Sequence, residues 1–306
     1  MFSFLSLIAR PQGKAFLFSY FTGNGEDGLH LAYSTDGLKW QPLNNGKSYL
    51  APTIGKDKLM RDPCIRQDKS GVFQLVWTSG WWDNGIGYAS SPDLMNWSEE
   101  KEIPVMQQEP QAKNCWAPEI CYDPKHKDYL IFWATTITGR FPDLASSERE
   151  KGLNHRIYYV STKDFKTFSP TKLFFNPAFN VIDATIIRKD KFFFLIVKNE
   201  NSKPAEKNIR TTKSKHAAGP YPVEVSAPIT GKYWAEGPSA LQVGDYVYVY
   251  FDKYTEHKYG AVRSKDMIHW EDISDQVSFP AGTRHGSAFK VSKNVLDKLL
   301  NHTSPD

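Results

Sequence analysis

The hydrophobic pattern of this chain repeats. A short stretch headed by one polar residue runs into a polar turn, and a mostly apolar run follows. Residues 183–187, for example, precede the apolar run 192–197, and residues 236–241 precede 246–251. Apolar runs of this length between turns are typical of β-strands. The polar residues that head the five stretches lie 49 to 64 residues apart and are Asp62, Glu119, Asp183, Glu236 and His285.

A second repeat alternates with the first. It combines a Ser/Thr-x-Asp turn with an aromatic residue a few positions later, and it follows a short apolar strand. An Asp or Ser side chain can hydrogen-bond its own backbone and so start a turn, after which the aromatic residue anchors the next strand. The copies are residues 34–40, 91–97, 161–168 and 264–270, with a weaker one at 211–215.

Together the two repeats define a unit of four antiparallel strands. The inner strand has the polar head, a long apolar strand follows, the third strand ends in the Ser/Thr-x-Asp turn, and the outer strand begins near the aromatic residue. Such units around an axis form β-propellers. We therefore predict an all-β fold, a five-bladed β-propeller with four antiparallel strands per blade, as one catalytic domain over residues 1–306.

The first and last repeats are incomplete, and this predicts how the ring closes. The turn at residues 34–40 has no inner strand before it, and the strand headed by His285 has no turn after it. Residues 15–45 should therefore complete the blade that the His285 strand begins, which removes a free sheet edge. Residues 294–300 predict a short helix.

Composition and net charge limit the kinds of partner that this chain is expected to bind. The net charge is +4 with scattered lysines, so we expect no nucleic-acid partner.

No stretch approaches the roughly 20 apolar residues of a membrane span. Residues 1–9 are apolar without a positive segment before them and predict an edge strand or loop, not a signal peptide. Location stays open: periplasmic or secreted if a signal was removed, otherwise cytoplasmic. The three cysteines lack zinc spacing. We expect a monomer.

Acids placed at the heads of inner strands come together at the axis of a propeller. Like charges in proximity destabilise one another and drive pKa values apart, so crowding needs a chemical reason. Glycoside hydrolysis supplies one, because one carboxyl group must stay protonated as a general acid while another is ionised. A third acid can adjust the pKa of the donor.

An ordered set of five motifs resembles glycoside hydrolase family 43, and the resemblance covers nearly the whole chain. The family implies a five-bladed propeller that acts with inversion on polysaccharides containing arabinose, xylose or sometimes galactose. Two features depart from its pattern: Ala184 stands where proline is frequent, and about 60 residues precede Asp62. The motifs are Asp62-Pro63 and residues 116–119 (WAPE), 182–184 (IDA), 236–238 (EGP) and 284–287 (RHGS).

The resemblance implies a role for each matching residue. Asp62 would be the general base, Asp183 the residue that modulates pKa, and Glu236 the general acid. His285 would hold a water molecule or, through water, a Ca or Na ion in the central channel, and no cofactor would be required. Glu119 lies two positions past the channel-facing point and is expected to be structural. The residues expected to bind substrate are Trp81, Trp82, Trp116, Arg284 and His285.

Several functions remain open at this stage. The leading hypothesis is an inverting exo-glycosidase acting on plant-type polysaccharide side chains, an α-L-arabinofuranosidase, because the irregular loop 135–155 would close one end of the channel. The alternatives are a β-xylosidase, an exo-β-galactosidase, or an endo-arabinanase or xylanase with an open groove. A non-catalytic carbohydrate-binding propeller would not need three acids. A sialidase would need an arginine triad, and only Arg61 and Arg284 lie at the strand entrances.

Overall fold

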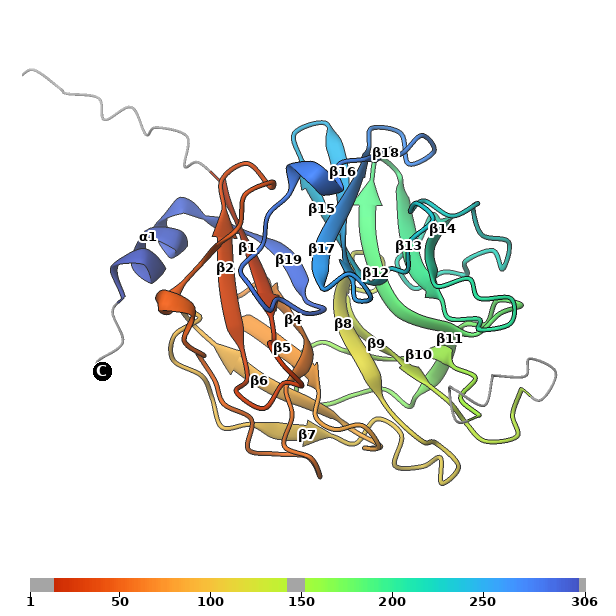
Figure 1. The fold of residues 1–306 in the computed structure, drawn as a ribbon. Coiled ribbons are helices and arrows are strands. Elements are labelled where there is room, and N and C mark those ends of the chain that lie inside the picture. Colours follow the sequence, from red (N-terminus) through yellow and green to blue (C-terminus); the bar gives the residue numbers. More distant parts are fainter. Residues whose placement is uncertain (1–13, 142–151, 303–306) are drawn as a thin grey trace, which may run out of the picture.

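The computed structural model describes residues 14–141 and 152–302, and they form a ring of five antiparallel sheets (Figure 1). The prediction of a five-bladed β-propeller is confirmed. Two blades come from the first half of the chain. Their strands are β4 (Arg61–Gln67), β5 (Phe73–Thr78), β6 (Ile86–Ser91) and β7 (Lys101–Ile103), then β8 (Trp116–Asp123), β9 (Asp128–Thr135), β10 (Arg156–Thr162) and β11 (Lys172–Phe175).

The next two blades differ in their outer edges. The blade that begins at Val181 has three strands within the described residues. The segment 226–229 takes the outer position of this blade, where Ser226 N–H and Ile229 N–H donate to the carbonyls of Thr211 and Ile209. The strands of these two blades are β12 (Val181–Lys189), β13 (Phe192–Asn199) and β14 (Asn208–Ser214), then β15 (Glu236–Val243), β16 (Tyr246–Lys253), β17 (Lys258–Ser264) and β18 (Glu271–Asp272).

The fifth blade closes the ring with both ends of the chain, as predicted. β1 (Lys14–Tyr20) pairs antiparallel with β19 (Ser287–Ser292) from Lys14↔Ser292 to Ser19↔Ser287. β2 (His30–Ser34) and β3 (Gln41–Pro42) complete the sheet. The predicted C-terminal helix is α1 (Lys293–Asn301), which begins after Ser292, whose side chain caps it by accepting a hydrogen bond from Val295 N–H. Short 3-10 helices lie at Asn44–Gly46 and Ser274–Gln276.

The hydrophobic core is divided into five clusters, each between neighbouring blades. Ile65 and Leu75 of one blade, for instance, pack with Leu17 and Phe289 of the closing blade. Each sheet therefore buries both faces, which explains why the second strand of every blade is almost wholly apolar. The polar residues of these second strands lie near the strand ends, as Lys198 does in β13 and Asp252 in β16. The inner strands β4, β8, β12, β15 and β19 contact one another around the axis.

The Ser/Thr-x-Asp repeat has the predicted turn chemistry. In the first copy the Ser34 hydroxyl accepts the N–H of Gly37, and Asp36 Oδ1 accepts the N–H groups of Leu38 and Lys39. The same bonds recur at Ser91, Thr162 and Ser264. The repeat is therefore a structural device of the blades. Among the described residues, no helix has the length and apolar character needed to cross a membrane.

Candidate active site

A shared irregularity aims side chains from the inner strands into the channel. β4, β8, β12 and β15 each lose register with their neighbour after the first residues of the strand. A bulge of this kind bends the strand and redirects a side chain. At each bulge one residue has a left-handed backbone: Asp62 (φ 52°), Ala117 (49°), Asp183 (52°) and Gly237 (60°). Two of these four positions carry carboxyl groups.

The bulges surround a cavity of about 220 Å³. It contains the three acids expected to be catalytic and four of the five residues expected to bind substrate. Trp82 is the exception, since it does not line this cavity. The lining residues are Arg61, Asp62, Thr78, Trp81, Trp116, Ile182, Asp183, Lys198, Glu200, Glu236, Arg284 and His285.

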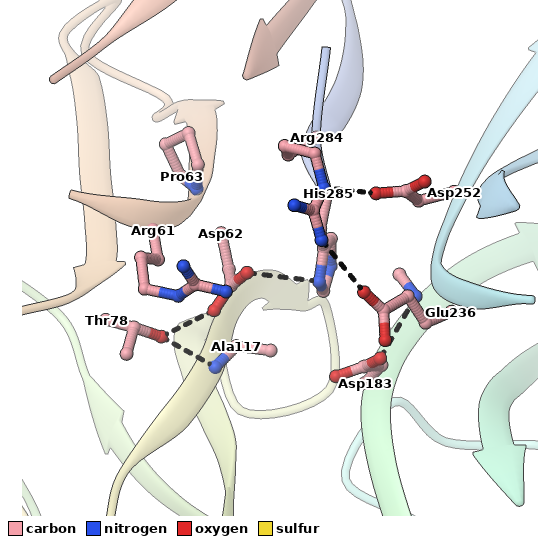
Figure 2. A network of polar contacts seen from close by, with 12 residues as sticks. Arg61, Asp62, Pro63, Thr78, Ala117, Asp183, Glu236, Asp252, Arg284 and His285 are labelled. Atoms are coloured by element: carbon pink, nitrogen blue, oxygen red, sulfur yellow. Dashed lines mark hydrogen bonds and ion pairs between the residues drawn. The ribbon is translucent and has the colours of Figure 1, made fainter. Parts of the chain in front are cut away.

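Asp62 is held by partners on both carboxylate oxygens (Figure 2). Oδ1 lies 3.3 Å from Nδ1 of His285, and Oδ2 accepts a 2.8 Å hydrogen bond from the Thr78 hydroxyl. That hydroxyl accepts the N–H of Ala117 in turn, at 2.9 Å. Burial by itself would raise the pKa of Asp62. The charge and hydrogen bond of His285 outweigh burial, and with Arg61 they lower this pKa to about 2. Asp62 is therefore ionised at neutral pH.

Asp183 has the opposite electrostatic character. It is 6% exposed, and its Oδ2 accepts the N–H of Gly237 at 3.0 Å. Burial is the main cause that raises the pKa of Asp183, to about 6. The carboxylates of Glu236 and Asp62 add to this rise, while the cations nearby oppose it. Asp62 on β4 and Asp183 on β12, the inner strands of two different blades, therefore differ widely in pKa.

Glu236 faces cations on both sides. Its Oε2 accepts a 3.0 Å hydrogen bond from Nζ of Lys198, and its Oε1 lies 3.7 Å from a guanidinium nitrogen of Arg284. Arg284 Nε donates to Asp252 Oδ2 at 2.8 Å (Figure 2). Burial, followed by the charge of Glu236, raises the pKa of Asp252 to about 6 against the effect of Arg284. The side chain of Glu236 is the most exposed of the three predicted catalytic acids, at 23%.

His285 is a buried cation. Burial would lower the pKa of its ring, but the charge and hydrogen bond of Asp62 raise it to about 9. A doubly protonated imidazole has no lone pair for a metal, so the ring does not fit direct coordination of a cation at neutral pH. Binding of an ion through water stays a prediction. Elsewhere in the described chain, a group with ligand atoms within 4.8 Å of one another lies on the β8–β9 turn: Asp123, His126 and Asp128.

Three tryptophans gather at one side of the cavity. The Trp116 ring lies 5.7 Å from Trp81 and 5.9 Å from Trp82, and its Nε1 donates to the carbonyl of Trp81. Trp81 and Trp82 are 37% and 43% exposed. The Arg61 guanidinium lies over Trp81, 4.2 Å from the ring centroid. Exposed aromatic faces beside a polar cavity suit the apolar C–H faces of sugars.

Glu119 lies deeper and joins blades together. Its Oε1 accepts from the Ser287 hydroxyl at 2.8 Å, and its Oε2 accepts from the Thr185 hydroxyl at 2.9 Å. Arg66 approaches Oε2 at 3.5 Å. The residue is 4% exposed and does not line the cavity. These contacts are those of a structural residue, as expected from its position two residues past Ala117.

The sequence interpretation missed the residues that reach the cavity from second strands. Lys198 and Thr78 line the cavity, and Asp252 holds Arg284 beside it. Their shared signal was visible: each is the last residue, or the last but one, of an otherwise apolar second strand, opposite the head of an inner strand. Thr78 pairs with Arg61, and Asp252 pairs with Glu236. Glu200, just past the end of β13, was missed for the same reason.

The fold is a five-bladed ring, and its cavity is lined by tryptophans and by carboxyl groups whose pKa values differ. These are features of a glycoside hydrolase. The family comparison agrees. A family model described as "Probable glycosyl hydrolase domain", of the group related to glycosyl hydrolase family 43, matches residues 12–297. The chain belongs to this family.

Individual relatives are distant. An α-L-arabinofuranosidase of Bifidobacterium longum subsp. longum is 22% identical over 58% of this chain, and the match spans only 18% of that protein's length. The solved structure of a Cellvibrio cellulosa α-L-arabinanase complexed with arabinohexaose is 16% identical with a TM-score of 0.60, covering 89% of this chain and 96% of that one. An exo-1,5-α-L-arabinanase from a bovine ruminal metagenomic library is 19% identical with a TM-score of 0.57, covering 86% and 94%. These structures share the fold.

Proposed function

We propose that this protein is an inverting, exo-acting glycoside hydrolase that removes terminal α-L-arabinofuranose units from plant-type polysaccharide side chains. The observation that carries the proposal is the convergence of Asp62, Asp183 and Glu236 in one cavity of about 220 Å³. Family membership supports hydrolysis of O-glycosyl bonds.

The chemistry assigns one step to each of two carboxyl groups. Asp62 is ionised and accepts a proton from a water molecule, whose oxygen forms a bond to the anomeric carbon. The bond from that carbon to the glycosidic oxygen breaks, and protonated Glu236 donates its proton to the departing oxygen. Attack from the face opposite the leaving group inverts the anomeric configuration.

The surroundings of Asp62 suit a base that must stay in one orientation. Thr78 fixes Oδ2 through a hydroxyl that is itself oriented by the N–H of Ala117. His285 stabilises the carboxylate charge at Oδ1. Asp183, whose pKa is raised by burial, is proposed to hold the substrate or to adjust Glu236 by its charge.

The size of the cavity supports action on a chain end. Pockets for drug-sized ligands measure about 300–1,000 Å³, so a cavity of about 220 Å³ suits roughly one sugar ring. The exposed tryptophans continue from it and could stack on the next sugar. The loop invoked for closing the channel, residues 135–155, lies partly outside the described residues. Arabinose is favoured because the relatives named above are an α-L-arabinofuranosidase and two arabinanases, whereas xylose or galactose would need only a different cavity contour.

The test is hydrolysis of p-nitrophenyl glycosides with proton NMR of the first product formed. We expect release from the α-L-arabinofuranoside above the β-xyloside and β-galactoside, with an inverted product. Asp62→Asn should lose at least about 100-fold in kcat/KM, the scale of general base catalysis. Glu236→Gln should lose more on unactivated oligosaccharides than on the aryl glycoside, because a good leaving group needs less protonation.

Other outcomes replace the proposal with named alternatives. A retained product would make Asp62 a nucleophile instead of a base. Preference for xyloside or galactoside would change the sugar, and cleavage only of internal bonds would indicate an endo-arabinanase or xylanase. Binding of arabino-oligosaccharides without turnover would indicate a carbohydrate-binding propeller.

A further inference from the structure

A chain of buried charges leads away from the cavity and is not used by the two-carboxyl chemistry. Lys198 is 2% exposed on its side chain, and its Nζ lies 3.0 Å from Glu236 Oε2 and 2.6 Å from Glu200 Oε2. Glu200 in turn accepts from Nζ of Lys207, which is also buried. One ammonium group is therefore shared by two carboxylates, and only Glu236 is a predicted catalytic acid.

The arrangement is physically demanding, which argues against an incidental surface pair. A buried ammonium loses hydration that is worth several kcal/mol, and it persists only with close partners. Burial lowers the pKa of Lys198, but Glu200 and Glu236 more than compensate and raise it well above its usual range. Lys198 is therefore charged at neutral pH and contacts both carboxylates at once.

Competition between the two carboxylates has a direct consequence for Glu236. When Lys198 lies close to Glu236, the anion of Glu236 is favoured, and a general acid must be protonated to act. When Lys198 lies closer to Glu200, Glu236 can take up a proton more readily. Glu200 is fixed from the other side by Lys207 and by its own N–H, which donates to Asn180 at 2.7 Å.

We propose that Lys198 is a positioning residue for Glu236, and that Glu200 sets how strongly Lys198 binds it by competing for the same ammonium group. The inference rests on the proposed role of Glu236 as the acid. It assigns a task to the segment 200–208, in which Lys207 anchors Glu200. The ionisable groups that act on Glu236 from the elements around it are Asp183, Lys198, Asp252, Tyr254, Tyr259, Arg284 and His285.

The experiment titrates the Glu236 carboxyl directly, by carbon-13 NMR of protein labelled at glutamate carboxyls. The signal is assigned by its absence in Glu236→Gln. In Lys198→Met the titration midpoint should rise by on the order of one pH unit, because an opposite charge within about 4 Å is lost. In Glu200→Gln it should fall, because Lys198 is then left to Glu236 alone.

A double variant separates competition from the direct field of Glu200. If Glu200 acts through Lys198, Glu200→Gln should move the midpoint little in the Lys198→Met background. Equal shifts in both backgrounds would overturn the proposal, as would shifts of the same sign in the two single variants. If Lys198→Met does not fold, Lys198→Gln replaces it.

Lys253→Met is the matched control. Lys253 is also a buried lysine at the end of a second strand, but it pairs with Glu256 at 2.9 Å. Its replacement should leave the Glu236 midpoint in place, and a shift as large as that of Lys198→Met would contradict a specific role. Because the titration needs no substrate, absence of turnover in the wild type would refute the proposed function without deciding this result. Where turnover occurs, the basic limb of kcat/KM should move with the midpoint.

Discussion

A charged neighbour decides whether a buried acid at the axis has a raised or a lowered pKa. Asp62 and Asp183 share a left-handed backbone, a bulge and a buried position, yet the pKa of Asp62 falls to about 2 and that of Asp183 rises to about 6. His285 donates to Asp62 alone, so only that carboxylate gains a bonded cation. The same pairing raises the pKa of His285 to about 9. A single contact thus separates the two acids into different chemical roles.

The Asp62–His285 pair predicts a defined pH dependence of stability. The pKa of His285 is raised on folding, so its contribution is fully present below an unfolded pKa of about 6.5 and is lost as pH rises to about 9. The shift corresponds to a loss of roughly 3 kcal/mol, at about 1.4 kcal/mol per pKa unit. Urea unfolding from about pH 6 to about pH 9.5 measures it.

A matched variant isolates the pair from other titrating groups. His285→Gln should be less stable than the wild type at about pH 6 and should approach it at about pH 9.5. Parallel stability profiles for the two proteins would show that His285 does not carry its proton in the folded state. At the acid end the sign reverses, because the pKa of Asp62 is lowered. Its contribution is present above about 3.8 and is lost toward about 2.

At the scale of the strand, the bulge explains why proline recurs near the start of the inner strands. Proline follows the left-handed residue in three of the four bulged strands, at Pro63, Pro118 and Pro238. Residues within the bulge leave the hydrogen-bonded register, so a missing N–H costs no ladder bond there. In β12 the residue after the left-handed Asp183 is Ala184. Alanine is also suited to this position, because the bulge requires only a residue outside the paired register.

Gly237→Ala should damage the site more than the fold. Its φ of 60° costs an alanine about 1–2 kcal/mol, and the added methyl group would meet the His285 ring. We expect kcat/KM to fall more than about tenfold, since His285 would move from Asp62. Gly244→Ala is the control: φ is 55° and nothing lies within 4 Å of the added carbon. Kinetics and denaturant unfolding are measured for both variants. Similar kcat/KM values would show that contact with His285 is not the cause of the loss of activity.

At the scale of the molecule, the closing blade joins two ends of the chain and packs against the blade before it. Phe18 of β1 is fully buried, and its ring lies 5.4 Å from Tyr259, 5.5 Å from Trp40 and 5.0 Å from Phe279. Tyr259 belongs to β17 of the neighbouring blade, so Phe18 links the closing blade to the ring. Edge-to-face packing of this kind adds to the free energy of burial.

Phe18→Ala should lower the free energy of unfolding by about 3–5 kcal/mol, as expected for a buried phenylalanine whose cavity cannot collapse. Phe18→Leu should recover part of the loss. Ile268→Ala removes a side chain that is 71% exposed and should change stability by no more than about 0.5 kcal/mol. Denaturant unfolding measures all three, and a Phe18→Ala loss near that of Ile268→Ala would show that the closing blade contributes little to the stability of the ring.

The order of polar and apolar residues along the chain is enough to predict the blades, their number and the way the ring closes. These features depend on strand periodicity and turn residues, which are local in the chain, and on the incomplete first and last repeats. It also placed Asp62, Asp183 and Glu236 at strand heads, and these do share one cavity.

Which side chains meet at that cavity depends on the folded arrangement of the blades and could not be predicted from the chain alone. The partners of Glu236 come from β13 and from the segment before β19, 38 and 48 residues away, through the register of pairing and the bulges. A bulge of one residue changes which side chains face the channel, so Glu119 joins blades while Asp183 lines the cavity. Trp82, in the turn after β5, lies beside Trp116 and outside the lining. Charge pairing across blades has no local signature, because it depends on distances that exist only once the ring has closed.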